Sequence, residues 1–329
     1  MSIVCVLGPG SWGTTLAVHF ATAGHDVRLW GHDPLELAAL ESNRENRKFL
    51  PGIKLPDRVK VCAELENGLA GADFSVFVVP SQVMGEVARR VRSTGPAGIP
   101  VCASKGIEQG SLCRMSEILA AELSDSEPVV LTGPSHAEEV SQGIPTSVVA
   151  ASLSGARARA VQELCSTDRL RVYTNTDVVG CEIGAALKNV IAIAAGVCDG
   201  IGFGDNTKGA LLTRGLAEIA RLGVALGGRR ETFFGLAGMG DLIATAMSRH
   251  SRNRWVGERL GRGETLEQVM GAMVMVAEGV HTARAARDLG VQHGVELPIT
   301  EQVCAMLFEH RSPREALQAL MTRDLKRED

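Results

Sequence analysis

Residues 3–13 read IVCVLGPGSWG, and residues 15–24 continue as TLAVHFATAG. Five apolar residues with a β-branched pattern predict a buried strand, and the segment after the glycines has the composition of a helix that Gly24 ends. Between them stands a GxGxxG sequence. A strand, a glycine-rich turn and a helix in this order predict the first βα unit of a doubly wound α/β domain.

The three glycines of this turn have different expected roles. Gly8 permits a tight turn, Gly10 lets the backbone approach a pyrophosphate, and Gly13 lets the helix pack closely on the strand. The helix N-terminus offers unpaired N–H groups to the phosphates. A bare GxGxxG is often only a glycine-rich turn, but the flanking strand and helix favour a dinucleotide site.

The identity of the dinucleotide stays open at this stage. Folds specific for NAD usually place an acidic residue after the second strand, whereas NADP needs a group that tolerates a phosphate there. Residues 31–33 are Gly-His-Asp, and the basic residues Arg44, Arg47 and Lys48 follow. Either NAD or NADP fits this pattern, and the basic cluster equally fits a solvated helix face.

Short β-branched runs alternate with helical segments up to about residue 180, which predicts a mostly parallel sheet. The expected strands are Ile3–Leu7, Val27–Trp30, Phe74–Val79, Pro100–Ala103, Val129–Thr132, Ser147–Ala151 and Arg171–Thr174, and the first expected helix is Thr14–Ala23.

Beyond that point only helical patterns remain, and two glycine-rich loops, Asp199–Lys208 and Gly235–Asp241, are expected between them. We therefore predict a Rossmann-type dinucleotide-binding domain over residues 1–181 and an all-helical substrate-binding domain over residues 182–329. The expected helices are Glu182–Val197, Lys208–Leu222, Arg254–Leu260, Leu266–Met273, Thr282–Leu289, Ile299–Glu309 and Pro313–Met321.

Composition restricts the class of protein. Hydrophobic residues make up 45% and charged residues 22%, which is typical of a folded globular chain. The formal charge of −4 argues against a nucleic-acid partner, which a basic surplus would accompany. The eight scattered cysteines show no zinc spacing, so no metal site is expected. The apolar stretch Ile183–Val197 is too short to span a bilayer, and no signal peptide is evident, so we expect a cytoplasmic protein.

Lys188 lies in the middle of an otherwise apolar helical pattern, EIGAALKNVIAIAAG. Small residues, Gly184, Ala185 and Ala192, surround its base at helical spacing and leave room for a ligand. Partial removal from water would make its ammonium group a better proton donor. The alternative from this helix alone is a core lysine paired with a carboxylate.

Four further stretches carry polar groups, three of them beside glycines. Ser104-Lys105-Gly106 and Thr132-Gly133-Pro134-Ser135 each follow a predicted strand, where ligands of doubly wound sheets bind. In the helical half, Gly238-Met239-Gly240-Asp241 precedes Ser251-Arg252-Asn253-Arg254. The planar guanidinium of arginine suits a pair of phosphate oxygens, although each segment alone also fits an ordinary loop or helix cap.

Taken together, these stretches resemble bacterial NAD(P)-dependent glycerol-3-phosphate dehydrogenases over nearly the whole chain. The matching stretches, in order, are GPGSWGTTLA, LWGHD, NRKFLPG, SKGIE, TGPSHAEEV, ALKNVIAIAAGVCDGIGFGDNTKGALLTRGLAEIARLG, FFGLAGMGDLIAT, SRNRWVG and AEGV. The resemblance implies reversible hydride transfer between NADH or NADPH and dihydroxyacetone phosphate, giving sn-glycerol 3-phosphate for phospholipid synthesis.

The resemblance also assigns roles to residues. Lys188 is implied to be the proton donor or acceptor, Lys105 to contact substrate and cofactor, and Asn189 and Thr245 to be supporting polar groups. The implied substrate-binding residues are Lys105, Gly133, Ser135, Lys188, Asp241, Ser251, Arg252 and Asn253. The implied cofactor-binding residues, with the glycine loop, are Ser11, Trp12, His32, Phe49, Lys105, Ala137, Arg252, Val276 and Glu278.

A few positions depart from the family pattern. His136 stands where an aromatic residue is usual, Ala246-Met247 replaces a more polar pair, and Ala277 replaces a usual valine. These differences affect the packing around the substrate rather than the chemistry.

Two other functions compete with this one. A related two-domain dehydrogenase for a hydroxy or keto acid would carry a carboxylate site in place of Ser251–Asn253. A non-catalytic dinucleotide sensor would need neither Lys188 nor Lys105. We also expect a homodimer, because the helices of the second half are apolar and rich in glycine and alanine.

Overall fold

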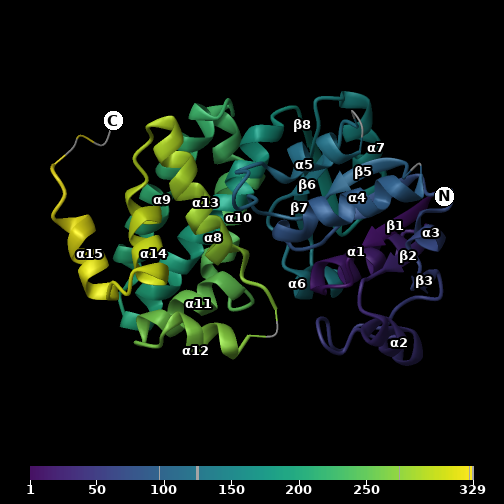
Figure 1. The fold of residues 1–329 in the computed structure, drawn as a ribbon, viewed down its shortest axis with the longest axis horizontal. Coiled ribbons are helices and arrows are strands. Elements are labelled where there is room, and N and C mark those ends of the chain that lie inside the picture. Colours follow the sequence, from purple (N-terminus) through teal and green to yellow (C-terminus); the bar gives the residue numbers. More distant parts are fainter. Residues whose placement is uncertain (96, 124–125, 274, 326, 328–329) are drawn as a thin grey trace. The chain divides into compact units, whose positions relative to one another are not determined.

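The computed structural model describes residues 1–329 except 96, 124–125, 274, 326 and 328–329, and it divides into two compact units (Figure 1). Unit 1 consists of Met1–Lys105 and Cys113–Glu182, and unit 2 consists of Gly106–Leu112 and Ile183–Asp329. The short segment Gly106–Leu112 belongs to unit 2, where the Gln109 side chain donates a hydrogen bond to the carbonyl oxygen of His281 at 3.3 Å.

Unit 1 is built on one sheet with the order β3-β2-β1-β4-β5-β6-β7-β8. The pairings between described strands are parallel except for β6 with β7, which confirms the predicted mostly parallel sheet. The first six positions follow the order of the doubly wound dinucleotide-binding fold. The strands are β1 (Ile3–Leu7), β2 (Asp26–Trp30), β3 (Val59–Cys62), β4 (Phe74–Phe77), β5 (Ile99–Cys102), β6 (Val129–Thr132), β7 (Thr146–Ala151) and β8 (Leu170–Asn175).

Seven of these strands lie within two residues of their predicted bounds, whereas β3 was not predicted. Its sequence, VKVC, is only four residues long and lies on the sheet edge, paired with β2 alone. So short a run carries too little alternation to stand out from a loop.

Helices cover both faces of this sheet. Side chains alternate along β1, so that Val4 and Val6 pack with Phe20 of the first helix, whereas Cys5 faces Gly68 on the other side. Each fully buried side chain of this kind contributes about 1.5–3 kcal/mol to folding. The helices of unit 1 are α1 (Ser11–Thr22), α2 (Pro34–Asn43), α3 (Leu65–Leu69), η1 (Ser81–Val83), α4 (Met84–Thr94), α5 (Met115–Glu122), α6 (Ala137–Ser141) and α7 (Gly155–Cys165).

Unit 2 is helical in its described residues (Figure 1), as predicted. It contains most of α8 (Val178–Ile201), then α9 (Asp205–Ala225), η2 (Arg230–Phe234), η3 (Leu236–Gly240), α10 (Asp241–Met247), α11 (Arg252–Gly261), α12 (Leu266–Gly271), α13 (Glu278–His293), α14 (Pro298–Phe308) and α15 (Pro313–Met321).

Neither glycine-rich segment forms the full loop that the sequence predicts. Helices α8 and α9 extend into Asp199–Lys208 and leave only residues 202–204 between them. Segment Gly235–Asp241, predicted as a loop, forms the π-helical turn η3 and the start of α10. Glycines obscured both helices in the sequence because they weaken helix propensity.

Helix α8 is longer than the apolar stretch that the sequence predicts. Its 24 residues are long and apolar enough to cross a membrane, but 94% of its most apolar window is buried inside the structure. A core helix has this character.

Where helices α8 and α11 cross, their backbones are in direct contact. A Cβ atom on Gly196 would lie 1.9 Å from the carbonyl oxygen of Arg254, and a Cβ atom on Gly257 would lie 1.9 Å from that of Ile193. Only glycine permits so close an approach. The crossing fixes the N-terminal end of α11, which carries Ser251, Arg252 and Asn253, against the helix that carries Lys188.

We predict that Gly196→Ala lowers the free energy of unfolding by about 3 kcal/mol, because the new methyl group meets backbone atoms that cannot rotate away. Gly271→Ala is the matched control, since a Cβ atom there meets nothing within 4 Å. Urea denaturation of both variants measures the difference. Equal stability of the two would contradict the close crossing.

Candidate active site

The glycine-rich turn of unit 1 has the predicted geometry. Gly8 has φ +112° and its N–H donates a hydrogen bond to the carbonyl oxygen of Trp30. A Cβ atom on Gly13 would lie 1.9 Å from the carbonyl oxygen of Gly8, so the helix starts directly against the strand. A Cβ atom on Gly10 meets nothing within 4 Å, which leaves space before the N-terminus of α1. This turn therefore fits a pyrophosphate.

Asn46, which was not predicted as a site residue, holds a second segment against that turn. Its buried side-chain amide donates to the carbonyl oxygen of Pro9 at 2.6 Å and to the hydroxyl of Thr14 at 2.7 Å. Its side-chain oxygen accepts from the N–H of Phe49 at 3.1 Å. Asn46 thus joins the predicted cofactor residue Phe49 to the glycine turn across more than thirty residues of sequence.

Most charged side chains in the segment after β2 are already bonded to other groups of the protein. Asp33 caps helix α2, and its carboxylate accepts from the N–H groups of Leu35 and Glu36. Arg44 donates to two backbone carbonyl oxygens, at 2.7 and 2.8 Å. Lys48 pairs with Glu36 at 2.5 Å. His32 is exposed. The residue type that usually selects NAD is therefore present but engaged in a helix cap.

The other predicted residues of unit 1 lie on two connected loops. The Lys105 ammonium donates to the carbonyl oxygen of Gly133 at 2.9 Å, and the Ser135 hydroxyl donates to the same oxygen at 3.0 Å. Gly133 has φ +135° and lies against the backbone of Val148. The structure therefore brings together the predicted substrate residues of this unit.

Helix α1 connects these loops to the glycine turn. The Thr15 hydroxyl hydrogen-bonds to the carbonyl oxygen of Ala137 at 3.2 Å. Ser11 is buried in the first turn of α1, and Trp12 packs partly against the core of the sheet.

In unit 2, Lys188 lies in a buried polar cluster with Asp241 and Thr245. Its ammonium nitrogen is 2.6 Å from the Asp241 carboxylate and 2.6 Å from the Thr245 hydroxyl, and that hydroxyl is 3.3 Å from the same carboxylate. The side chains of Lys188 and Asp241 are 7% and 2% exposed. Lys188 therefore pairs with a carboxylate, as one interpretation of its helix expected, and it also lies among the predicted catalytic residues.

Glycines allow this cluster to form. A Cβ atom on Gly184 would lie 2.8 Å from the carbonyl oxygen of Ala237, so the π-helical turn η3 lies directly on α8. Asp241 follows this turn as the first residue of α10. Single π-helical turns often accompany functional sites, because they redirect the side chains that follow.

The remaining predicted residues gather at the N-terminal ends of α11 and α13. The Ser251 hydroxyl caps α11, and Arg252 donates to the carbonyl oxygen of Val276 at 2.8 Å. The buried side chain of Asn253 accepts from the N–H of Gly279 at 2.9 Å. Glu278 is the first residue of α13, and Asn189 is buried beside Lys188 in α8.

A charge cluster behind these residues was not identified from the sequence. Asp199, near the end of α8, pairs with Arg254 at 2.6 Å and with Lys208 of α9. Arg254 lies in the first turn of α11. The cluster therefore fixes the helix end from which Arg252 and Asn253 project.

Glu182, expected at the start of the second domain, belongs to unit 1. Its buried carboxylate accepts from the N–H of Ser116 at 2.8 Å and pairs with Arg114 at 2.5 Å. Burial raises the pKa of the Glu182 carboxyl, and Arg114 opposes that effect. Its role is to anchor the start of α5.

The positions that depart from the family pattern lie in different surroundings. His136 precedes α6 as its cap residue, and Ala246 and Ala277 are buried. Met247 is 61% exposed. The described residues contain no group of three or more His, Cys, Asp or Glu side chains that could hold a metal ion.

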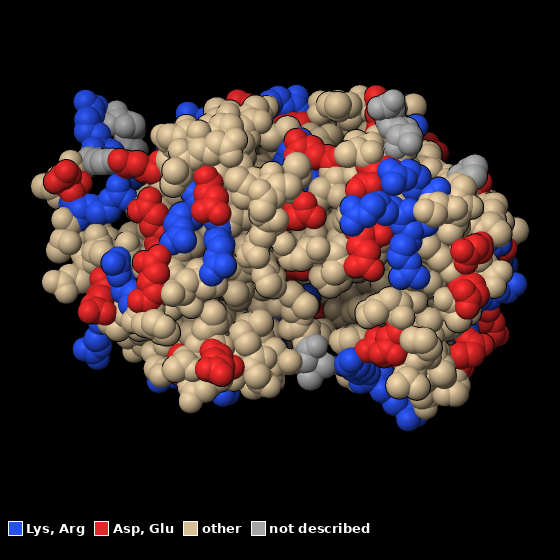
Figure 2. Space-filling view, viewed as in Figure 1, with Lys and Arg blue, Asp and Glu red and all other residues tan. Residues whose placement is uncertain are grey.

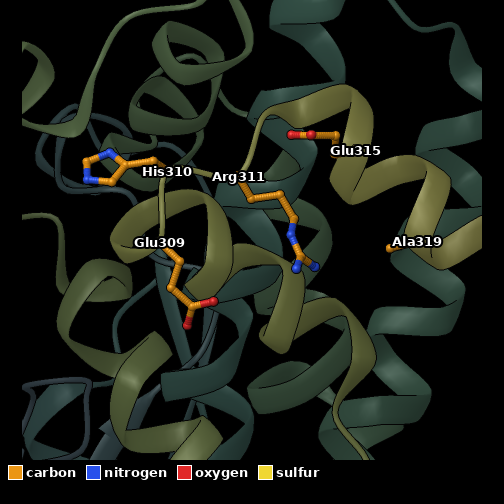
Figure 3. Close-up of a pocket in the computed structure, with 5 residues that line it drawn as sticks. All are labelled: Glu309, His310, Arg311, Glu315 and Ala319. Carbon is orange, nitrogen blue, oxygen red and sulfur yellow. The ribbon is translucent and has the colours of Figure 1, made fainter.

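A surface recess of about 470 Å³ lies elsewhere, at the junction of α14 and α15 (Figure 3). Its charged groups are engaged, with Glu309 paired to Arg287 at 2.7 Å and Arg311 bonded to Gln302 at 2.8 Å. Figure 3 shows the side chains of His310 and Arg311 pointing away from each other. The recess contains none of the predicted site residues.

Two models of one protein family together match most of the chain. The family model described as NAD-dependent glycerol-3-phosphate dehydrogenase N-terminus matches residues 3–158, and the model for the C-terminus of the same family matches residues 177–318. The chain belongs to the NAD-dependent glycerol-3-phosphate dehydrogenase family. This confirms the resemblance found in the sequence.

Individual relatives cover the chain almost completely. The chain is 52% identical over 329 residues to glycerol-3-phosphate dehydrogenase [NAD(P)+] of Pelodictyon phaeoclathratiforme, covering 99% of both chains. It is 51% identical, with the same coverage, to that of Chlorobium luteolum. A crystal structure of glycerol-3-phosphate dehydrogenase from Coxiella burnetii superposes with a TM-score of 0.95 at 36% identity, covering 98% of this chain and 99% of that one.

We predict that Asn46→Ala raises the KM for NADH about ten-fold, because the turn and Phe49 lose their shared buried hydrogen bonds. Turnover at saturating NADH should change much less. Asn43→Ala is the matched control, since that side chain bonds within its own helix, to the carbonyl oxygen of Ala39. An unchanged KM in steady-state kinetics of Asn46→Ala would show that the contact does not support the cofactor site.

Proposed function

We propose that this chain catalyses the reversible, NAD(P)-dependent reduction of dihydroxyacetone phosphate to sn-glycerol 3-phosphate. The observation that carries the proposal is the buried cluster of Lys188, Asp241 and Thr245, with its 2.6 Å contacts. The homologues named above, which cover almost the whole chain, support it. The product is the phosphorylated triol on which glycerophospholipids are built, so we place the reaction in phospholipid synthesis.

The glycine turn fits the dinucleotide, and Ser11, Trp12, His32, Phe49 and Ala137 are the residues of unit 1 that would hold it with Lys105. Arg252, Val276 and Glu278 are further residues that we propose to bind the cofactor. When bound, the reduced dinucleotide supplies the hydride that becomes the hydrogen on the central carbon. The Asp33 carboxylate is occupied in capping α2, so we do not assign it a role in selecting NAD over NADP, and the proposal includes both cofactors.

Lys188 supplies the proton. As the ketone carbon gains hydride, negative charge grows on its oxygen, and the ammonium of Lys188 transfers a proton to that oxygen. Asp241 keeps the ammonium charged and oriented until transfer, and the Thr245 hydroxyl fixes its direction. In the reverse direction, neutral Lys188 takes the hydroxyl proton. Asn189 is a supporting residue.

The other proposed roles follow from charge and geometry. Lys105 stabilises the developing oxyanion, with Gly133 and Ser135 lining the substrate. Arg252 binds the phosphate with its planar guanidinium, and Ser251 and Asn253 complete that site. Binding energy from the phosphate positions the distant ketone.

The first prediction under this proposal is that the purified protein oxidises NADH or NADPH when dihydroxyacetone phosphate is added, followed by absorbance at the nicotinamide band. An unchanged absorbance with both cofactors would contradict the proposed dehydrogenase activity. Turnover of a 2-keto acid instead would favour a hydroxyacid dehydrogenase. Ketopantoate reductase from Ralstonia eutropha shares the fold, with a TM-score of 0.61 at 14% identity. The fold alone therefore does not distinguish a glycerol-3-phosphate dehydrogenase from an enzyme that acts on a keto acid.

The second prediction concerns Lys188. Lys188→Ala should lower turnover about 10²–10⁴-fold while NADH binding, measured by fluorescence titration, stays unchanged. Because this variant leaves the Asp241 carboxylate buried without its partner, it should also lose about 3–5 kcal/mol of stability. Lys188→Arg is the control that keeps the ion pair but cannot release a proton. Near-normal turnover of Lys188→Arg would contradict proton transfer by Lys188, because it would show that turnover needs only a positive charge at this position.

We also propose a cytoplasmic homodimer. Phe234, Ile243 and Met247 of unit 2 are 54%, 48% and 61% exposed, and the last two lie one turn apart on α10. Exposed apolar side chains that form a contiguous patch mark contact sites between protein chains. On the face shown in Figure 2, Lys and Arg are interspersed with Asp and Glu.

Analytical ultracentrifugation tests the dimer. We expect one species of about twice the chain mass of 34.8 kDa. Ile243→Glu should shift it toward the chain mass, because a buried unpaired carboxylate is costly. A single species at the chain mass for the unmodified protein would refute the dimer.

A further inference from the structure

Asn253 is held in one orientation by a backbone group of another helix. It is the second residue of α11, and its side-chain oxygen accepts a hydrogen bond of 2.9 Å from the N–H of Gly279. Gly279 is the second residue of α13. Backbone N–H groups in the first turn of a helix have no acceptor within that helix, so this one is available for Asn253.

The chemistry of the carboxamide makes this contact directional. An N–H group only donates, so it selects the oxygen of Asn253 and excludes its NH₂ group. The NH₂ group is therefore fixed on the opposite side of the carboxamide. The dianion of a phosphate monoester such as the substrate accepts hydrogen bonds and has no proton to donate, so it needs NH₂ rather than C=O.

Gly279 can make this contact only because it has no side chain. A Cβ atom there would lie 2.7 Å from the Asn253 side-chain oxygen and 2.7 Å from the carbonyl oxygen of Asn189. The Asn189 carbonyl is helix backbone and cannot rotate away. Gly279 therefore joins α13 both to the proposed phosphate-binding residue Asn253 and to the turn of α8 that carries Lys188.

We propose that Gly279 is a positioning residue that makes Asn253 a hydrogen-bond donor toward the substrate phosphate and so contributes to selection of phosphorylated substrates. The inference rests on the proposed function. It assigns no contact between Gly279 and the substrate, since the glycine acts through Asn253.

The test is Gly279→Ala, with Gly209→Ala as the matched control. Both glycines lie near the N-terminal ends of unit 2 helices, Gly279 as the second residue of α13 and Gly209 as the fifth residue of α9, but a Cβ atom on Gly209 meets nothing within 4 Å. We expect Gly279→Ala to raise the KM for dihydroxyacetone phosphate and the inhibition constant of inorganic phosphate about ten-fold, the factor for one lost charge-assisted hydrogen bond. The KM for NADH should stay within two-fold, and kcat should fall less than the KM rises.

Two results would overturn the inference. One is an unchanged inhibition constant for inorganic phosphate in Gly279→Ala. The other is a parallel loss of kcat, substrate affinity and NADH affinity with a lowered melting temperature, which a purely structural glycine would produce.

Asn253→Asp keeps the test decisive if Gly279→Ala does not fold. The new carboxylate has the same shape and still accepts from Gly279, but it presents an oxygen where the NH₂ group stood. We expect inhibition by inorganic phosphate to disappear, whereas phosphate inhibition like that of the unmodified protein would overturn the inference.

Calorimetric titration of inorganic phosphate into the unmodified protein and into Gly279→Ala separates this inference from the proposed function. Phosphate binding that Gly279→Ala weakens, in a protein that never reduces dihydroxyacetone phosphate, would refute the function alone. Turnover with equal phosphate binding in both proteins would refute the inference alone.

Discussion

A buried ammonium group constrains the design of the helical unit. Moving Lys188 out of water costs several kcal/mol, and that cost is offset only if a carboxylate lies close and the remaining groups are hydrogen-bonded. Asp241 at 2.6 Å and Thr245 at 2.6 Å meet this requirement. Both come from a helix that follows a π-helical turn, and that turn reaches α8 only because Gly184 has no side chain. The cost of burying the Lys188 charge thus accounts for Gly184, for the π-helical turn η3 and for the short helix α10.

The dinucleotide unit uses the same combination of glycine contacts and buried polar groups. Gly8 and Gly13 let strand, turn and helix pack at backbone distance. The Asn46 amide then satisfies the carbonyl oxygen of Pro9 inside the turn and holds Phe49 beside it. Close packing creates buried backbone groups, and a single side chain from a distant segment satisfies them.

Much of the fold follows from local sequence, and much of the site does not. The parallel strands and long helices carry clear periodicity, and the glycine turn, Lys188 and Asp241 stand out by residue type. The edge strand β3 is too short to show alternation, and α10 is hidden behind glycines. Asn46 and Gly279 escape prediction because their roles depend on partners 37 and 26 residues away. Such pairings arise from tertiary packing and leave no pattern along the chain.

The central claim is that the Lys188 ammonium delivers a proton, and chemical rescue of Lys188→Ala tests it most directly. The deleted side chain leaves space for a small amine beside Asp241. The account predicts that ethylamine restores reduction of dihydroxyacetone phosphate in a saturable manner, whereas tetramethylammonium, a cation with no proton to give, restores none. Equal rescue by both cations, or none by ethylamine, would contradict it.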